Sequence, residues 1–532
     1  MSQQQYDLII IGAGAGGGTL AYALAPTGKR ILILERGDYL PREKENWDPD
    51  ALFLEERYYA DEQWYDADRN AFNPETHYFV GGNTKVYGAV LQRMRQQDFG
   101  EIYHHDGVAP AWDLDYEDFE PYYTQAEHLY KIHGDRHEDP TEPPATEDYP
   151  YPPFPHEPRI QEVADGLRAE GLHPFHATLA LDRNVHHPHH SRCIRCDTCD
   201  PYPCLVDAKC DAQVTCVDQA IQYPNVDLQT HTCVQRLVTD ASGQRITAVE
   251  AIQDGVPRRF EAKMVIVACG AVNSAKLLLQ SANEQHPNGL ANSSDLVGRN
   301  LMLHNHSAVI AVARKPNPTR FQKTLAFHDY YFKGPDTDYP LGAVQLTGKA
   351  KWQRLKRFAN PLIPNEILKY IAHHSVDFWV TTEEIPKPEN RVRVGSQGEV
   401  ILDYTENNLT PHRQLIDVLK RHLRRQGFYW FWVNRMPLQV VWHQAGTCKF
   451  GRDPQTSVLN LNCQTHDIDN LYVVDSSFIP TMGAVNLTLT IVANALRVAD
   501  HLKQRLGVEA IALPQNDGYG ARTLASEFSG KS

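Results

Sequence analysis

The spacing of apolar residues along the chain predicts its clearest structural unit at residues 6–35. Residues 7–11 form a short isoleucine-rich run, as a strand buried in a parallel sheet requires. Glycines follow at 12, 14 and 16–18, residues 19–25 predict a helix, and residues 30–34 predict a second strand. A strand, a helix and a strand within about thirty residues form a βαβ unit.

Similar patterns return in the middle and at the end of the chain. Residues 264–268 predict a strand and residues 271–280 a helix, while residues 471–475 predict a strand before a helix that begins at about Leu487. Residues 301–440 alternate apolar and polar positions, as strands do. In the Pro-, Tyr- and His-rich stretch 98–217, residues 116–132 are the one strong helical pattern.

The elements predict an α/β fold with two discontinuous domains. Residues 1–97, 218–300 and 455–510 are expected to form a Rossmann-like nucleotide-binding domain. Residues 98–217 and 301–454 are expected to form an α+β substrate domain with an antiparallel sheet, including a Cys-rich loop at 186–216. Residues 511–532 are rich in Gly and Ser and predict a flexible tail.

Charge and composition indicate which partners and which cellular location to expect for the protein. The formal charge of −14 is spread along the chain, so a polyanion would be repelled and nucleic acid is not an expected partner. No run of eighteen apolar residues predicts a transmembrane helix, and the N-terminus lacks the features of a signal peptide. We therefore expect a cytoplasmic protein, in which ten cysteines are free thiols or metal ligands.

The glycine-rich turn carries the first chemical motif. Gly12, Gly14 and Gly17 fit G-x-G-x-x-G, and the turn follows a strand and opens a helix whose N-terminus can face a pyrophosphate. Glu35, at the end of the second strand, can bind ribose hydroxyls. These features predict a dinucleotide site but leave FAD and NAD equally open.

Motifs later in the chain point to one family. His443-Gln444-Ala445-Gly446-Thr447-Cys448 precedes the strand at 471–475, and Asn486-Leu487-Thr488 leads into the last helix. Together with the segments 81–84 and 268–274, and in this order, these motifs resemble the glucose–methanol–choline (GMC) oxidoreductases over nearly the whole chain.

The resemblance implies an extended FAD and a catalytic pair. His443 would be the base and Asn486 its partner, both near flavin N5, which takes the hydride. An imidazole with a pKa near 6.5 suits removal of a hydroxyl proton, and a carboxamide can hydrogen-bond the developing alkoxide. Asp475 would lie near the pyrophosphate, and the dipole of the helix beginning near Asn486 would stabilise charge on the reduced flavin.

Further FAD contacts are expected along the whole chain: Gly82, Asn83, Thr84, Val234, Ala268 and Val485. Two departures from the family pattern bear on this segment. Val86 stands where some members attach FAD covalently through a histidine, so we expect non-covalent FAD. Tyr87 stands where many members carry Asn, which makes the flavin contacts there differ.

The cysteine loop is open to two interpretations. Cys193, Cys196, Cys199 and Cys204 offer four soft ligands for an iron–sulfur cluster or zinc, and some multisubunit dehydrogenases of the family have such an insertion. Alternatively, the thiols only structure the loop. A basic run at 349–358 predicts a solvated helix, a lid over the substrate or a peripheral contact with an anionic membrane.

The sequence therefore predicts an FAD-dependent oxidoreductase acting on a CH–OH group of an alcohol, polyol or sugar-like substrate. The electron acceptor stays open between oxygen, a quinone and a carrier protein, although a cluster in the cysteine loop would favour a dehydrogenase. Two alternatives are a non-redox flavin lyase or decarboxylase on the same scaffold and an electron-transferring subunit of a dehydrogenase complex.

Overall fold

The computed structural model describes residues 5–508, and its central feature is a five-stranded parallel sheet built from distant parts of the chain. Its order is β10 (Val226–Gln229), β2 (Ile31–Leu34), β1 (Tyr6–Ile11), β14 (Ala262–Val267) and β22 (Leu471–Val473). β1 pairs in parallel with both β2 and β14, with Ile10 opposite Ile33 and Ile266. The mixed α/β fold class is confirmed.

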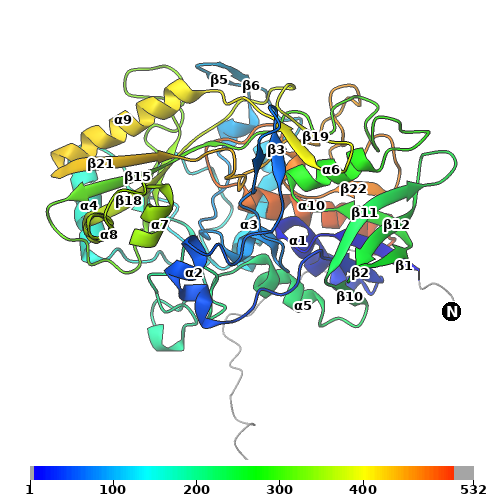
Figure 1. Ribbon diagram of the computed structural model, residues 1–532, viewed down its shortest axis with the longest axis horizontal. Helices are drawn as coiled ribbons and strands as arrows, with labels where there is room; N and C mark the ends of the chain where they lie inside the picture. The colour runs from blue at the N-terminus through cyan, green and yellow to red at the C-terminus, as the bar shows by residue number, and fades with distance from the viewer. Residues whose placement is uncertain (1–4, 509–532) are drawn as a thin grey trace, which may run out of the picture.

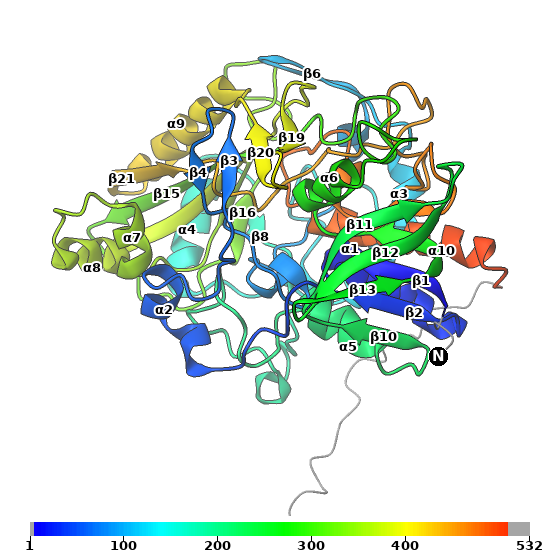
Figure 2. The same cartoon turned by 45° about the vertical axis from the view of Figure 1, so that its right-hand side comes forward.

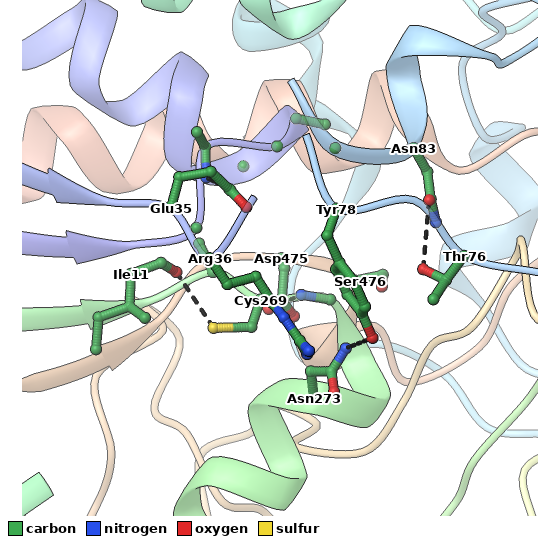
Figure 3. A pocket seen from close by; sticks show the side chains of 18 of the residues that line it. Ile11, Glu35, Arg36, Thr76, Tyr78, Asn83, Cys269, Asn273, Asp475 and Ser476 are labelled. Carbon is green, nitrogen blue, oxygen red and sulfur yellow. Dashed lines mark hydrogen bonds between the residues drawn. The ribbon is translucent and has the colours of Figure 1, made fainter. Parts of the chain in front are cut away.

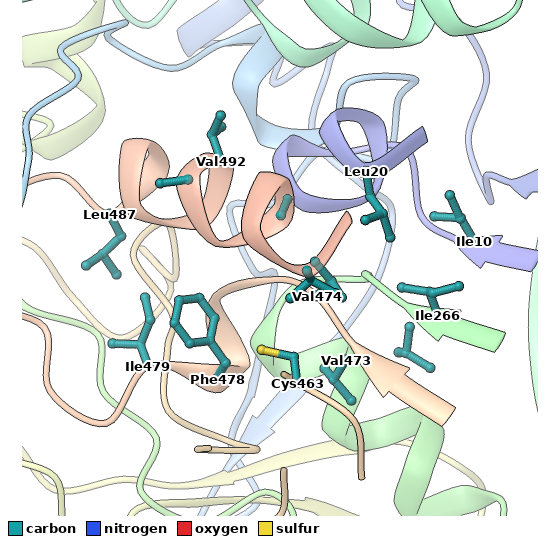
Figure 4. Packing of buried hydrophobic residues seen from close by; sticks show 14 of the residues in the cluster. Ile10, Leu20, Ile266, Cys463, Val473, Val474, Phe478, Ile479, Leu487 and Val492 are labelled. Atoms are coloured by element: carbon teal, nitrogen blue, oxygen red, sulfur yellow. The ribbon is translucent and has the colours of Figure 1, made fainter. Parts of the chain in front are cut away.

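Helices from three parts of the chain pack on this sheet (Figures 1 and 2). α1 (Ala15–Leu24) contacts α10 (Thr488–Arg505), and α10 contacts α3 (Tyr116–Leu129). Leu20, Val474 and Val492 are fully buried where α1, the end of β22 and α10 meet (Figure 4). An antiparallel sheet of β11 (Thr232–Thr239), β12 (Ile246–Gln253) and β13 (Val256–Phe260) completes this half with α6 (Ala271–Gln280) and α5 (Asp218–Ala220).

The other half is built on a six-stranded sheet. Its order is β21 (Phe428–Arg435), β15 (Asn305–Ala313), β18 (Ser375–Thr382), β17 (Ala343–Leu346), β16 (Leu325–Phe327) and β8 (Phe175–His176). All neighbouring strands within it are antiparallel. A smaller sheet contains β19 (Arg391–Val394), β20 (Val400–Asp403), β3 (Trp64–Asp66) and β4 (Ala71–Phe72). Two further antiparallel pairs join β5 (Ile102–His104) with β6 (Gly107–Ala109) and β7 (Ile132–His133) with β9 (Leu179–Ala180).

Helices cover both faces of the sheet at β15. Because successive side chains of β15 point to opposite faces, alternate residues pack against different helices. Val309 and Ala311 pack with α4 (Pro158–Ala169) and α9 (Leu409–Arg425). Ala308 and Ile310 point the other way and pack with α7 (Trp352–Phe358) and α8 (Asn365–His374). Successive side chains of a strand point to opposite faces, which explains this division.

Three expectations about elements need correction. The stretch 98–217 holds a second substantial helix, α4, besides α3. The part predicted as sheet-rich also carries α7, α8 and α9. The helix expected at 19–25 begins four residues earlier, at Ala15, because the glycines after Gly14 are helical. α2 (Pro49–Phe53) lies in a stretch without a clear pattern, and the predicted tail at 511–532 lies outside the described residues.

Candidate active site

A cavity of about 380 Å³ opens where the carboxyl ends of β1, β2, β14 and β22 meet the N-termini of α1, α6 and α10 (Figure 3). It reaches from the glycine-rich turn to His443. Ligands of open parallel sheets bind at this edge. Of the predicted site residues, those that line it are Gly12, Gly14, Glu35, Gly82, Asn83, Thr84, Val234, Ala268, His443 and Asp475.

The glycine turn combines close packing with open space. A Cβ on Gly16 would lie 1.9 Å from the Val474 carbonyl oxygen, and one on Gly17 would lie 2.1 Å from that of Gly12. In contrast, a Cβ on Gly14 would have no atom within 4 Å. Gly14 caps α1 without any side-chain hydrogen bond to the helix amides. The turn therefore leaves both room and uncapped N–H groups beside the cavity, as a phosphate requires.

Two buried carboxyls fix the backbone around this turn. Glu35 accepts hydrogen bonds from the amides of Ala13, at 3.0 Å, and Gly37, at 2.9 Å. Asp475 accepts from the amides of Gly270, at 3.0 Å, and Ser477, at 2.8 Å, and so ties the end of β22 to the start of α6. Burial raises the pKa of both carboxyls.

Three predicted residues lie outside the cavity wall. Gly17 serves the packing of α1 against the turn, and Val485 is buried. Asn486 immediately precedes the cavity-lining residues Leu487 and Thr488, and its amide Nδ2 lies 3.3 Å from Gln345 Oε1 on β17.

His443 sits at the far end of the cavity against two other histidines. Its Nδ1 lies 3.0 Å from Nδ1 of His304 and 3.1 Å from Nε2 of His306. His304 Nε2 is in turn 2.9 Å from the carbonyl oxygen of Gly483, three residues before Asn486. Burial lowers the pKa of His443 to about 4 and that of His304 to about 3, so both rings are neutral at physiological pH.

These contacts assign the protons on the rings. A carbonyl only accepts, so His304 Nε2 donates to Gly483 and Nδ1 of the neutral His304 ring has a lone pair. The 3.0 Å contact is then a hydrogen bond only when His443 Nδ1 donates. A neutral His443 with its proton on Nδ1 has a lone pair on Nε2. Among residues 5–508, both hydrogen-bond contacts of the His443 side chain use Nδ1, and the ring lines the cavity.

Comparisons with known proteins decide the family. Two profiles described as GMC oxidoreductase match this chain, at residues 6–306 and 406–495. The chain belongs to the GMC oxidoreductase family.

Members of the family with named activities align over most of the chain. A 6'''-hydroxyparomomycin C oxidase from Streptomyces lividus is 31% identical, covering 95% of this chain and 93% of the relative. A fructose dehydrogenase large subunit from Gluconobacter japonicus is 26% identical, covering 93% of this chain and 97% of the relative. Pyridoxine 4-oxidase from Mesorbium loti shares the fold, with a TM-score of 0.66 at 17% identity over 94% of this chain and 99% of that one.

Family membership makes this chain an FAD-dependent oxidoreductase of the class that acts on CH–OH groups. The site fits the cofactor: the cavity has the size of ordinary ligand pockets, and the glycine turn leaves space and uncapped amides for a pyrophosphate. None of the helices within residues 5–508 is long and apolar enough to cross a membrane.

Sequence reasoning missed several residues of this GMC site. His304 and His306 escaped notice, although two histidines separated by one residue beside an apolar run are a visible signal in the sequence. Arg36 also lines the cavity and stacks its guanidinium 3.7 Å from the centre of the Tyr78 ring. No motif signals that contact, because Arg36 and Tyr78 meet only in the folded chain.

The prediction of a metal or cluster in the cysteine loop gains no support from the structure. Within the described residues, no three of Cys193, Cys196, Cys199 and Cys204 bring their sulfurs within 4.8 Å of one another, as a zinc ion would require. Cys193 is buried in the hydrophobic core, and Cys199 and Cys204 pack against it. Burial raises the pKa of the Cys193 thiol to about 12, which favours the protonated form.

The alternative interpretation, thiols that structure a loop, agrees with these contacts. Tyr87, which departs from the family pattern, donates a hydrogen bond of 2.5 Å to the carbonyl oxygen of Cys210 and anchors the loop. The preference for a dehydrogenase over an oxidase depended on a cluster in this loop and is therefore not supported.

The basic run at 349–358 contains α7, and two of its cations form ion pairs with other segments. Arg357 pairs with Glu56, at 3.0 Å, and Glu75, at 2.9 Å, while Lys351 pairs with Asp197. Leu355 buries the inner side of the helix. These cations hold α7 against the rest of the molecule.

Proposed function

We propose that this GMC oxidoreductase oxidises a CH–OH group of an alcohol, polyol or sugar-like substrate, with His443 as the base. The observation that carries the proposal is the position of His443, whose Nδ1 lies 3.0 Å from Nδ1 of His304 and whose ring lines the cavity. We infer that this Nδ1 donates to His304, which leaves the lone pair of His443 on Nε2. Bound FAD supplies the acceptor for the hydride that leaves the carbon.

The chemistry of the reaction supports this role. A hydride leaves an alcohol carbon readily only when the hydroxyl proton is removed, and a partly buried, neutral imidazole with an unprotonated nitrogen can take that proton. We propose that Asn486 orients the substrate oxygen from the start of α10, because its amide belongs to the segment that meets the cavity at Leu487. The contact with Gln345 would then give way to the substrate.

We further propose that FAD is held without a covalent bond, because Val86 has no nucleophilic atom. Its pyrophosphate would lie at the uncapped start of α1, and Glu35 would face its ribose. On this assignment residues 1–97, 218–300 and 455–510 are the FAD-binding domain, and residues 98–217 and 301–454 the substrate domain. The parallel sheet draws all its strands from the first set.

The substrate class is supported by the relatives. Their names include oxidation of paromomycin-type and paromamine molecules, of fructose and of 2-methyl-1,2-propanediol. Each of these molecules carries hydroxyl groups. A cytoplasmic location is likewise our proposal, supported by ten free cysteines, all within the described residues.

An anaerobic titration of the purified holoenzyme with alcohols, polyols and aminosugars tests the proposal. We expect at least one of them to bleach the oxidised flavin band, and His443→Ala to slow that bleaching about 10²- to 10⁴-fold. His137→Ala, which removes an exposed imidazole, serves as the control and is expected to react at the wild-type rate. Equal rates for His443→Ala and the wild type would overturn the assignment, and turnover without bleaching would favour a non-redox lyase.

A second proposal concerns peripheral membrane contact. We favour an apolar rather than a cationic contact, because Lys351 and Arg357 of the basic run are held in ion pairs. Large apolar and aromatic side chains are exposed on α8, β21 and the turn before α8: Leu362, Ile367, Tyr370, Tyr429 and Trp430. The hydroxyl groups of Tyr370 and Tyr429 lie 3.4 Å apart, so α8 and β21 present one surface. Such amphipathic rings suit the membrane interface. We call these five side chains the aromatic face.

A further inference from the structure

Two other imidazoles converge on the proposed base, His443, far from the cysteine loop in sequence. The ring nitrogens of His304, His306 and His443 lie within 4.8 Å of one another, the one such group of three potential metal ligands found within residues 5–508. His304 and His306 are buried and His443 is partly so.

The three neutral rings have too few N–H groups to make a hydrogen bond at every contact between them. Nδ1 of His304 carries a lone pair, as the Gly483 contact requires, and it faces Nδ1 of His443. His306 Nε2 faces the same His443 atom at 3.1 Å, while its Nδ1 is 3.2 Å from the hydroxyl of Thr381. If His306 donates to Thr381, two lone pairs share the single N–H of His443. If it instead accepts from Thr381, its own N–H meets that of His443. Neutral rings thus leave one contact unsatisfied in either case.

A divalent metal ion would satisfy all three nitrogens at once. Tetrahedral zinc with Zn–N bonds of 2.0–2.1 Å places its nitrogen ligands about 3.3 Å apart, close to the 3.0 and 3.1 Å seen here. Metal-bound histidines usually hold their outer nitrogen on a carbonyl or another polar group. His304 does so on Gly483 and His306 on Thr381. The ring of Trp379 lies 5.0 Å from that of His306 and limits its movement.

We propose that His304, His306 and His443 form a binding site for a transition-metal ion of the Zn²⁺ type, and that the ion switches the base off. Zn²⁺ would take the place of the proton on Nδ1 of His443. For the ring to stay neutral, that proton must move to Nε2, which then has no lone pair for the substrate. The second half of the proposal rests on the proposed function of His443, whereas the site itself rests only on the three rings.

Zinc content and flavin reduction together test the site and the switch. The holoenzyme is first treated with a chelator, then incubated with Zn²⁺ and freed of excess, and its zinc is counted by elemental analysis. We expect His306→Gln to hold about one Zn²⁺ less per chain than the wild type and to bind the ion about 100-fold more weakly. In the wild type, bound Zn²⁺ should suppress reduction of the flavin by an alcohol, whereas in His306→Gln the rates with and without Zn²⁺ should agree.

Controls separate this site from other ligands. His412→Gln removes another buried imidazole, one that contacts Ser307 and Thr382 instead of the group, and should keep the wild-type zinc content. The exposed histidines at 186–190 are present in all variants, so any ion they hold cancels in the difference between variants. His304→Gln provides a second ligand removal if His306→Gln does not fold.

Each outcome has one meaning. Equal zinc content in the wild type, His306→Gln and His304→Gln would overturn the site. A zinc-loaded wild type that is reduced at the metal-free rate would overturn the switch. If no alcohol reduces even the metal-free enzyme while zinc content still differs, the proposed function fails and the metal site stands.

Discussion

The chemistry assigned to His443 depends on residues that its own motif does not contain. The H-x-x-G-T pattern identifies the ring, but the position of its proton follows from His304, which is 139 positions away in the chain and is held by the carbonyl of Gly483. Sequence reasoning found the base because the motif is local. It missed the two histidines beside it because their meeting is a property of the folded strand order.

At this scale we predict an acid-shifted pH profile. The base must be neutral, and burial lowers the pKa of His443 to about 4, so its neutral form is present above that pH and is lost as the pH falls through it. The rate constant for flavin reduction, measured anaerobically in a stopped-flow pH jump, should therefore stay level from about pH 8 to about pH 5 and decline below about pH 4. A decline centred near pH 6.5 would show an ordinary, solvated imidazole and contradict the buried arrangement.

Local elements were predictable where one strong signal acts alone. The two strands of the βαβ unit, α6 and the start of α3 match the expected positions because apolar runs and glycines mark them. α9 was missed inside an alternating stretch, although it buries Leu415, Leu419 and Leu423 at helical spacing. The strand expected at 471–475 ends at Val473, because Asp475 turns to cap the short helix that follows.

Two glycines of the first turn, the most closely packed and the least closely packed, lead to a prediction about this element. Gly16→Ala would push a methyl group into the Val474 carbonyl, so α1 must move, at a cost of about 1–3 kcal/mol. Gly14→Ala meets no protein atom and has an ordinary φ of −78°, so the apoprotein should keep its melting temperature. Its methyl group would instead occupy cofactor space.

Thermal melting of the apoprotein and FAD titration distinguish the two variants. We expect Gly14→Ala to bind FAD at least about tenfold more weakly, a loss of about 1.4 kcal/mol, without loss of apoprotein stability. Gly16→Ala should lose stability before any cofactor is added. Wild-type FAD affinity in Gly14→Ala would place the pyrophosphate elsewhere.

At the scale of the molecule, the order of the strands in the sheets could not be predicted from the sequence. A discontinuous nucleotide-binding unit was expected from three segments, but nothing in the chain indicates that β10 lies at the edge beside β2 or that β15 sits between β21 and β18. Those neighbours depend on long-range pairing. The same assembly brings β21 beside α8 and so creates the aromatic face, whose parts are about sixty residues apart in sequence.

Vesicle binding tests whether the aromatic face is a membrane contact. Leu362 is 87% exposed, and the transfer of such side chains into the interface is driven by apolar area, which salt does not screen. The holoenzyme should therefore sediment with phosphatidylcholine vesicles as well as with anionic ones, and added salt should change this little. Leu362→Asp combined with Ile367→Asp should abolish sedimentation. Val256 lies on β13, in the other half of the molecule, and is about as exposed as Ile367. The control variant Val256→Asp should therefore leave vesicle binding intact. Binding confined to anionic vesicles and lost in salt would instead indicate a cationic surface, and a concentration-dependent dimer without vesicle binding would mean that a second copy covers the face.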